Sequence, residues 1–271
     1  MDRGAGLIES YWILLLIGWG IAAVLQLGLY GLQRATGDAT AVDAGWAASL
    51  VLVAAAYAAL APGEIEHRVL VATLAGLENL RIAYLVLERV GNGEDPRYEE
   101  LRRRWRERGR EQLTFFVFFQ GQALIAVVFS VPLLLASFNR ESGLEPLEWA
   151  GAALWLAAAS LELVADRQLG RFKSDPDNKG KTLRAGLWRY SRHPNYFFQW
   201  LTWCGYALIA LAAAWGWLGL VAPALMLYLI VFVTGIPPSE KQALRSRGED
   251  FRRYQRETSP FVPWFPKRAS A

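Results

Sequence analysis

The stretch RYSRHPNYFFQW, residues 189–200, places three basic residues, an Asn and two Tyr directly against the start of a strongly apolar segment. A membrane helix usually begins with one or two interfacial anchors, so this cluster is too dense for anchoring alone. Charged and amide groups at the end of a span are costly unless a partner satisfies them, so Arg192, His193 and Asn195 together favour a bound ligand. Taken singly, His193 is also explained as a helix cap and Tyr196 as an aromatic anchor.

The segment that leads into this stretch, Asp166–His193, carries eight Lys and Arg but only three carboxylates. Its Pro176, Asn178, Gly180 and Gly186 indicate a loop rather than a long paired helix, so its positive charge is expected to be unpaired. Guanidinium groups bind phosphate oxygens bidentately, and ammonium groups supply a point charge. We therefore predict a phosphorylated cofactor here. The chain has no strand followed by G-x-G-x-x-G, so a Rossmann site is excluded.

Apolar helices must position these residues. The chain has 271 residues, 54% of them hydrophobic, and a mean hydropathy of +0.17, values typical of an integral membrane protein. A bilayer span needs ~20 mostly apolar residues, which predicts an all-α polytopic fold. We expect seven transmembrane helices, at about Tyr11–Leu32, Ala44–Ala61, Val69–Leu87, Leu113–Phe138, Trp149–Ala165, Asn195–Ala214 and Trp217–Ile236.

Positive charge is concentrated on one side of these predicted spans. Arg89–Gln112, Arg167–His193 and Pro237–Ala271 each contain eight of the 29 Lys and Arg, whereas Asn139–Glu148 contains one and Ala214–Gly216 none. The positive-inside rule places the three basic blocks in the cytoplasm. Seven spans then put the N-terminus outside and the C-terminus in the cytoplasm, and a bacterial inner membrane is the predicted location.

Two of the basic blocks are expected to form helices. In PRYEELRRRWRERGREQ, residues 96–112, Glu and Arg interleave at helical spacing, which predicts a self-paired amphipathic helix at the membrane surface. The C-terminal block begins with Pro237-Pro238 and then indicates a charged helix from Glu240 to about Arg256. We expect this helix to cover the cytoplasmic opening of the helix bundle, which the predicted loop Asp166–His193 also lines.

Several classes of site and partner are not expected. One Cys and two His argue against a metal site, and the clustering of the basic residues beside spans argues against nucleic acid as a partner. The first ten residues, MDRGAGLIES, lack the basic start of a cleavable signal peptide, so we expect the first helix to be retained. The partners predicted are the lipid bilayer and a lipid substrate, and the protein is expected to be a monomer.

Three blocks in combination resemble a known family: ADRQLGRFKSDPDNKGK (residues 165–181), GLWRYSRHPNYFFQWLTWCGYAL (residues 186–208) and E-x-x-x-L-x-x-x-G-x-D-F-x-x-Y from Glu240 to Tyr254. They are similar to the C-terminal half of the steroid 5-alpha-reductase family, in its bacterial branch, and sterol delta-14 and delta-7 reductases share R-H-x-N-Y. The resemblance covers about Asp166–Pro263. It implies NADPH-dependent reduction of a carbon–carbon double bond in a 3-oxo-delta-4 steroid or similar enone lipid. One membrane domain over 1–271 is implied, with a lipid pocket in 1–148 and a cofactor-binding half in 149–271.

The resemblance also implies which residues hold NADPH. The residues implied to bind the adenosine and phosphate portion of NADPH lie in the predicted loop, namely Asp166, Lys173, Asn178 and Lys181. The central motif supplies Trp188, Tyr190, Arg192, His193, Asn195 and Tyr196, and the closing helix supplies Glu240, Arg247 and Tyr254. Relatives continue N-Y-x-G-E, whereas this chain has Phe198 and Gln199 in place of the Gly and the carboxylate. The Gln199 amide retains hydrogen-bonding capacity toward the nicotinamide, but a negative charge is lost.

The catalytic acid is expected inside the bundle, because hydride addition to an enone requires a proton donor at the carbonyl oxygen. Tyr84 and Glu78 on the third predicted span are the candidates, at a spacing that keeps them on roughly one face with Arg81 between them. The alternative is that Glu78 and Arg81 form a buried pair that stabilises the bundle. In the family a Tyr on this helix works with a carboxylate on the preceding helix, and the second predicted span has none in its interior.

Two alternatives to the reductase remain. Isoprenylcysteine carboxyl methyltransferases share R-H-P-x-Y and the pattern of the C-terminal helix and also lack the N-Y-x-G-E carboxylate, which makes methyl transfer from S-adenosylmethionine the second hypothesis. The cation-rich loop favours a cofactor with several phosphates, and S-adenosylmethionine has none. The third hypothesis is an inactive, lipid-binding membrane protein, prompted by Gln199 and by the missing acid in the second span.

Overall fold

The computed structural model describes residues 9–88, 90 and 93–267. These residues form helices joined by short connections, with an isolated bridge between Ser191 and Ser259 and no extended strand among them. The predicted all-α class is confirmed. Residues 1–8, in the segment expected to lack a signal peptide, and the basic-block residues Arg89 and Arg268 lie outside the described residues.

The chain divides into two compact units. The first unit comprises Met1–Pro146 and Ile209–Val221, and the second comprises Leu147–Leu208 and Ala222–Ala271. Residues 209–221, which comprise the last two residues of α7 and the segment after it, thus join the N-terminal unit. The expectation of a single membrane domain over 1–271 stays a prediction.

The described part of the first unit is built from α1 (Tyr11–Thr36), α2 (Ala41–Leu60), α3 (Ile65–Leu87), α4 (Pro96–Glu107) and α5 (Glu111–Ala136), with the 3₁₀ turn Gly216–Leu220 against α5. Small residues and buried hydroxyls join the long helices, as is usual for helices in membranes. Gly18 on α1 lies against Tyr57 of α2, whose hydroxyl is 3.0 Å from the Ser130 hydroxyl of α5. Three helices therefore meet at one buried polar contact.

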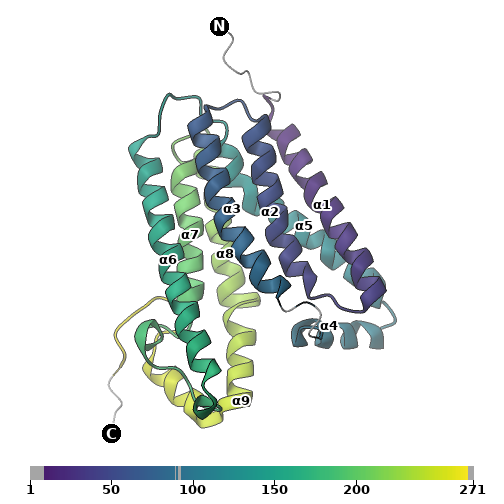
Figure 1. The fold of residues 1–271 in the computed structure, drawn as a ribbon, viewed down its shortest axis with the longest axis vertical. Helices are drawn as coiled ribbons and strands as arrows, with labels where there is room; N and C mark the ends of the chain where they lie inside the picture. Colours follow the sequence, from purple (N-terminus) through teal and green to yellow (C-terminus); the bar gives the residue numbers. More distant parts are fainter. Residues whose placement is uncertain (1–8, 89, 91–92, 268–271) are drawn as a thin grey trace. The chain divides into compact units, whose positions relative to one another are not determined.

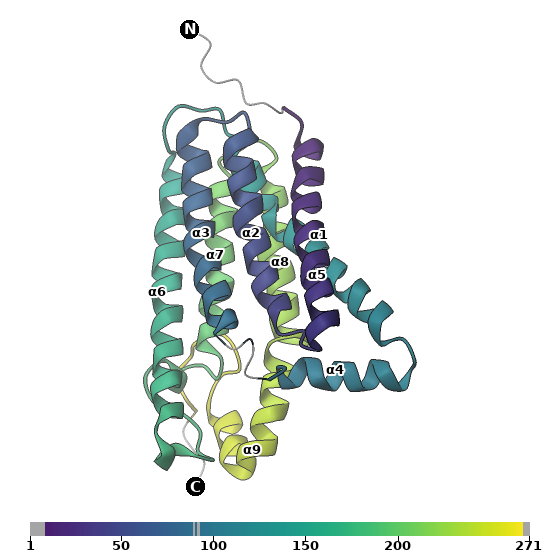
Figure 2. The same cartoon turned by 45° about the vertical axis from the view of Figure 1, so that its right-hand side comes forward.

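The short helix α4 runs across the ends of α1, α2 and α5 instead of alongside them, as both views show (Figures 1 and 2). Its Pro at the first turn and the Asp95 side chain, which accepts a hydrogen bond from the Arg97 amide, begin the helix. Glu100 pairs with both Arg103 and Arg104 along the helix. A self-paired helix forms as predicted, but it ends at Glu107 and not at residue 112, because the chain turns at Gly109, which has φ of 65°. Its position at a membrane surface stays a prediction.

The second unit contains α6 (Pro146–Ser174) from Leu147 onward, α7 (Pro194–Ala210) as far as Leu208, α8 (Val221–Tyr228) from Ala222 onward, a π-helical turn (Leu229–Val233) and α9 (Ile236–Glu257). Two 3₁₀ turns, Pro176–Asn178 and Gly186–Arg189, lie between α6 and α7. Gly205 of α7 faces the α6 backbone so closely that a Cβ atom there would lie 2.9 Å from the Gly151 carbonyl oxygen. This close approach requires glycine.

The described residues include six helices that are long and apolar enough to cross a membrane: Tyr11–Thr36, Ala41–Leu60, Ile65–Leu87, Glu111–Ala136, Pro146–Ser174 and the continuous run Gly216–Glu257. An integral membrane protein is thus supported. The remaining predicted span corresponds to α7, which has 17 residues. The count of seven stays a prediction.

Two local expectations need correction. The segment from Asp166 was predicted to be loop, but α6 continues to Ser174, because no helix-breaking residue occurs before Pro176 and Gly170 alone does not end a helix. The C-terminal helix forms as expected but is bent, since Gly248 has a non-helical φ of 54° and ψ of −123°. Such a left-handed φ is readily adopted by glycine.

Candidate functional site

The residues before α7 are held to the C-terminal helix by the side chain of Arg192. Its Nε donates to Glu240 Oε1 at 2.7 Å, and its Nη1 donates to the carbonyl oxygens of Gln255 at 3.0 Å and Thr258 at 2.7 Å. The last two acceptors lie at the C-terminal end of α9, where carbonyl groups lack helical partners. Arg192 therefore ties both the start and the end of α9 to the start of α7, and we call this set of contacts the Arg192 brace.

Glu240 is the centre of the Arg192 brace. Besides Arg192, its carboxylate accepts from the Gln255 amide at 2.7 Å, and His193 Nε2 lies 3.3 Å from it. Burial raises the pKa of Glu240, but the hydrogen bonds from His193, Arg192 and Gln255 and the charge of Arg192 outweigh burial and lower the pKa to about 2. The carboxylate is thus charged at neutral pH and stabilises the brace.

Acidification is expected to loosen α9. The folded-state pKa of about 2 lies below the ordinary value of 4.5, so the stabilisation from Glu240 is present above about pH 4.5 and is lost as the pH falls toward 2. Pepsin cleavage within α9, followed by mass spectrometry between pH 5 and pH 2, measures this loss.

The Glu240→Gln variant is the control for that experiment, because it lacks the titrating group. It is expected to be cleaved faster than the native protein at pH 5 and at a similar rate near pH 2. The ratio of the two cleavage rates at each pH cancels the pH dependence of pepsin itself and of the carboxyls that both proteins share. A constant ratio across this range would contradict the role of Glu240.

The first turn of α7 carries the polar pair Asn195 and Tyr196. The Asn195 side-chain amide donates to Asp166 Oδ1 on α6 at 3.1 Å, while its own Oδ1 is buried and has no hydrogen-bond partner among the described residues. Tyr196 stacks on the His193 ring, with centroids 5.3 Å apart and planes 3° apart, and its hydroxyl lies 3.0 Å from the Ser239 hydroxyl. Asn195 is therefore held in place with one unused acceptor.

The 3₁₀ turn before the motif rests on α6 and α9 through buried contacts. The Trp188 indole donates to the Ala165 carbonyl at 3.0 Å, and the Tyr254 hydroxyl donates to the carbonyls of Trp188 and Ser191, the latter at 3.1 Å. Burial raises the pKa of Tyr254, so it remains a neutral donor. Trp188 and Tyr254, both predicted to contact cofactor, are engaged with the backbone of their own unit.

The loop cations were predicted to be unpaired, but Arg184 and Arg192 form ion pairs and Lys173 also has an interaction partner, so for these three residues the prediction is wrong. Arg184 pairs with Asp250 at 2.8 Å and with Glu257 at 3.4 Å, and Arg192 pairs with Glu240. Their partners lie on α9, 48 to 73 residues further along the chain, so local spacing did not reveal them. Lys173 and Lys181 are exposed.

The other predicted cofactor residues lie around these contacts. Asn178 is half-buried and donates to the Phe172 carbonyl at 3.2 Å, which fixes the first 3₁₀ turn. Tyr190 packs edge-on against Phe265, with ring centroids 6.0 Å apart, and Arg247 lies 4.9 Å above the Phe251 ring. Burial lowers the pKa of Arg247. Gln199 is half-buried on the second turn of α7.

Several residues of this site were missed by sequence reasoning. Gln255 and Ser239 contact the predicted residues Glu240 and Tyr196, and Gln168 accepts from the Leu187 amide at 3.0 Å. Gly186 packs directly against the Gln168 amide and has φ of +60°. Glu240 and Gln255 are 15 residues apart, about 22 Å along a straight helix, so the bend at Gly248 brings them together and their spacing carried no signal. Gln168 and Ser239 carried none either.

The predicted catalytic residues lie on α3 in the first unit. Glu78 is 5% exposed and Tyr84 is 63% exposed. Six residues correspond to about 120° of rotation around an ideal helix, so the two side chains leave α3 in different directions. Glu78 and Arg81 both take part in polar contacts. The pairing of Tyr84 with Glu78 stays a prediction.

Comparison with known proteins places the chain near steroid reductases. One family, described as "Protein of unknown function (DUF1295)", matches residues 29–258. The protein named 3-oxo-5-alpha-steroid 4-dehydrogenase 1 from Macaca fascicularis is 28% identical over 112 residues, which are 41% of this chain and 40% of the relative. The proteins of the same name from Bos taurus and Homo sapiens are 27% identical, over 44% and 41% of this chain and 43% and 40% of the relatives.

These matches confirm the resemblance to the steroid 5-alpha-reductase family. The chain spans about two fifths of the length of the curated relatives it matches. No solved structure matches the chain.

Proposed function

The chain belongs to the DUF1295 family, and from its similarity to proteins named 3-oxo-5-alpha-steroid 4-dehydrogenase 1 we propose that it is an NADPH-dependent membrane reductase. The substrate proposed is the carbon–carbon double bond of a 3-oxo-delta-4 steroid or a similar enone lipid. One observation supports NADPH binding more strongly than the others do. Asn195 is held by Asp166 and by the braced start of α7, yet its Oδ1 is buried without a described partner.

The residues of the second unit fit a dinucleotide in two groups. Lys173 and Lys181 are exposed cations suited to phosphate oxygens, with Asn178 shaping the turn between them. Asn195 and Gln199 carry amides suited to the nicotinamide carboxamide, because an amide both donates and accepts hydrogen bonds. An unused buried acceptor such as Asn195 Oδ1 costs free energy, which a carboxamide N–H would recover.

The remaining cofactor residues are proposed to act as a frame for these contacts. Arg192, His193 and Glu240 hold α9 to α7, and Trp188 and Tyr254 hold the preceding turn to α6 and α9. In this proposal Tyr190, Tyr196 and Arg247 line the same region and supply aromatic surface and positive charge. The frame keeps Asn195 oriented before cofactor arrives, which lowers the ordering cost of binding.

The chemistry is proposed to follow the usual logic of enone reduction. NADPH, when bound, would supply a hydride to the beta carbon of the enone. The substrate carbonyl oxygen then gains electron density, and a proton donor beside it stabilises that charge. We assign Tyr84 on α3 as this donor and keep Glu78, which leaves the same helix in another direction, as a separate candidate acid. Apolar helices would exclude water from the reaction.

The membrane arrangement proposed is the seven-span one. The 17 residues of α7 would be the sixth span, and the basic blocks would face the cytoplasm, with the C-terminus inside and the N-terminus outside. A bacterial inner membrane and a monomer are proposed. NADPH would enter from the cytoplasm and the lipid from the bilayer.

Titration of the purified protein in detergent is expected to reveal NADPH binding and no S-adenosylmethionine binding. Asn195→Leu, which removes the amide at nearly constant size, is expected to weaken NADPH about 5- to 10-fold through loss of about one hydrogen bond. Gln242→Leu is the matched control, because Gln242 is an exposed amide on α9. Calorimetry with each cofactor measures both results.

Three outcomes decide between the hypotheses. Binding of S-adenosylmethionine alone would overturn the reductase in favour of a methyltransferase. NADPH binding without hydride transfer to a panel of enone steroids would favour an inactive lipid-binding protein, and activity gained by Gln199→Glu would then indicate natural loss of function. An equal loss of NADPH affinity in Asn195→Leu and Gln242→Leu would remove Asn195 from the cofactor site.

A further inference from the structure

The surface helix α4 covers its apolar side within its own unit. Tyr98, Leu101 and Trp105 pack against aromatic residues at the start of α5, and the Trp105 and Phe115 ring centroids are 4.8 Å apart. Because protein covers this face, it is not available for insertion into a bilayer. Only the charged face of α4 remains open to a partner.

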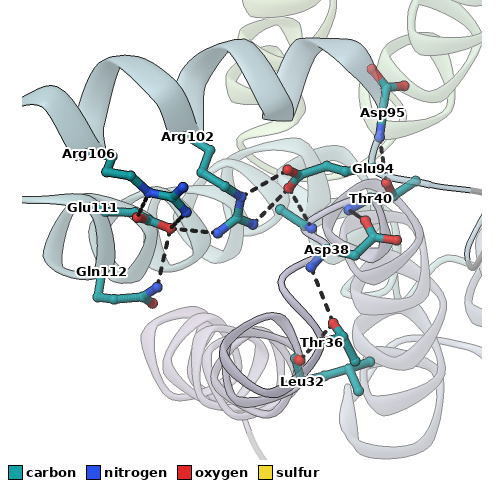
Figure 3. Close-up of polar contacts among 11 residues, drawn as sticks. Leu32, Thr36, Asp38, Thr40, Glu94, Asp95, Arg102, Arg106, Glu111 and Gln112 are labelled. Carbon is teal, nitrogen blue, oxygen red and sulfur yellow. Dashed lines mark hydrogen bonds and ion pairs between the residues drawn. The ribbon is translucent and has the colours of Figure 1, made fainter.

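One arginine of α4 is used to hold the helix in place. The Arg102 guanidinium donates to both oxygens of Glu94, each at 2.8 Å, and to Glu111 Oε1 at 2.7 Å (Figure 3). Glu94 also accepts from the Ala39 amide at 2.9 Å, so the contact joins α4 to the α1–α2 connection and to α5. With a side chain 11% exposed, Arg102 serves the fold and not a partner.

The arginines near the end of α4 divide into paired and unpaired groups. Arg103 and Arg104 share Glu100, and Arg106 pairs with Glu111 at 2.8 Å. Arg108 and Arg110 are exposed, and neither forms an ion pair with any described carboxylate. Two uncompensated guanidinium groups therefore flank the turn at Gly109.

This turn lies where a membrane boundary is expected. A hollow of about 410 Å³ at the turn is lined by Arg106, Gly109, Arg110, Glu111, Gln112 and Leu113. The Glu111 carboxylate is neutralised there by Arg102 and Arg106. Leu113 and Val117, 63% and 59% exposed, lead from it along α5, one of the candidate spans. Guanidinium groups directly before lipid-facing side chains lie at the depth of lipid phosphates.

We propose that the corner between α4 and α5 binds the head group of an anionic phospholipid. Arg108 and Arg110 would contact its phosphate, and one acyl chain would lie along Leu113 and Val117. Guanidinium groups suit this role because they donate two parallel hydrogen bonds to phosphate. The contacts of Arg102 hold the corner in place and leave the charges of Arg108 and Arg110 available. This site is independent of the proposed reductase activity.

Native mass spectrometry of the full chain in neutral detergent, titrated with phosphatidylglycerol or phosphatidylcholine, tests this site. Phosphatidylglycerol is expected to bind more tightly, and rising salt is expected to weaken it. The double variant Arg108→Gln/Arg110→Gln is expected to bind phosphatidylglycerol about 10- to 30-fold more weakly. Arg103→Gln/Arg104→Gln removes the same charge from residues already paired with Glu100, and a loss of less than about 3-fold is expected.

Three results would overturn the proposal. The first is equal binding of the two lipids to the native protein, a comparison that does not depend on any variant folding. The second is an equal loss in the two double variants, which would indicate a diffuse charge effect. The third is displacement of phosphatidylglycerol by glycerol 3-phosphate at similar concentration, which would assign the site to a soluble phosphate.

Discussion

Replacing Arg192 with Met is expected to destabilise the docking of α9 by about 3 kcal/mol, the lower end of the range for breaking a buried ion pair. The side chains of Arg192 and Glu240 are only 10% and 15% exposed, so the Glu240 charge would be left with His193 and the Gln255 amide alone. The carbonyls of Gln255 and Thr258 would also lose their donor. Hydrogen exchange of α9 amides measures the change.

Arg189→Met is the matched control for this prediction. Arg189 is exposed on the neighbouring 3₁₀ turn and forms no ion pair among the described residues, so a change below about 0.5 kcal/mol is expected. The double variant Arg192→Met/Glu240→Leu is expected to recover part of the loss, because it removes the unpaired charge. Equal exchange in Arg192→Met and native protein would contradict the brace.

Replacing Tyr84 with Phe is expected to lower hydride transfer to an enone steroid about 10²- to 10⁴-fold, the usual contribution of a general acid. The change removes one hydroxyl and retains the ring, and Tyr84 is 63% exposed on α3, so the fold of the first unit is expected to persist. NADPH affinity is expected to be unchanged, because the proposed cofactor residues lie elsewhere in the chain. Deuterium transfer from labelled NADPH, detected in the steroid product, measures the rate.

Tyr228→Phe is the control, since Tyr228 is another exposed tyrosine on an apolar helix, at 55% exposure. It is expected to retain activity. Glu78→Gln separates the two readings of Glu78: a loss of turnover with unchanged stability would support a catalytic role, whereas a loss of stability would support a buried pair with Arg81. Full turnover by Tyr84→Phe would exclude Tyr84 as the proton donor.

Local sequence pattern determined much of the helical framework. The predicted first span begins at Tyr11 and the third ends at Leu87, where α1 begins and α3 ends. The pairing of Glu100 with Arg103 and Arg104 follows from their spacing of three and four residues. Apolar length and helical periodicity are properties of neighbouring residues, so they can be recognised from the sequence without the tertiary structure.

The candidate site could be predicted from the sequence only in part. The sequence singled out Arg192, His193 and Asn195 because polar groups rarely crowd the start of an apolar run. It did not indicate what each side chain contacts. Arg192, expected to bind a ligand, makes three contacts within its own unit, and Asn195 retains an unused acceptor. That either residue binds a ligand stays a prediction.

Tertiary structure alone decided how the loop cations are used. Arg184 meets Asp250 and Glu257, 66 and 73 residues later, and Arg192 meets Glu240, 48 residues later. These pairs form because α9 folds back onto the segment between α6 and α7. A carboxylate lowers the free energy of a guanidinium only within a few ångströms. The sequence therefore determined which charges are present, and the packing of α9 against the segment between α6 and α7 determined which of them are neutralised.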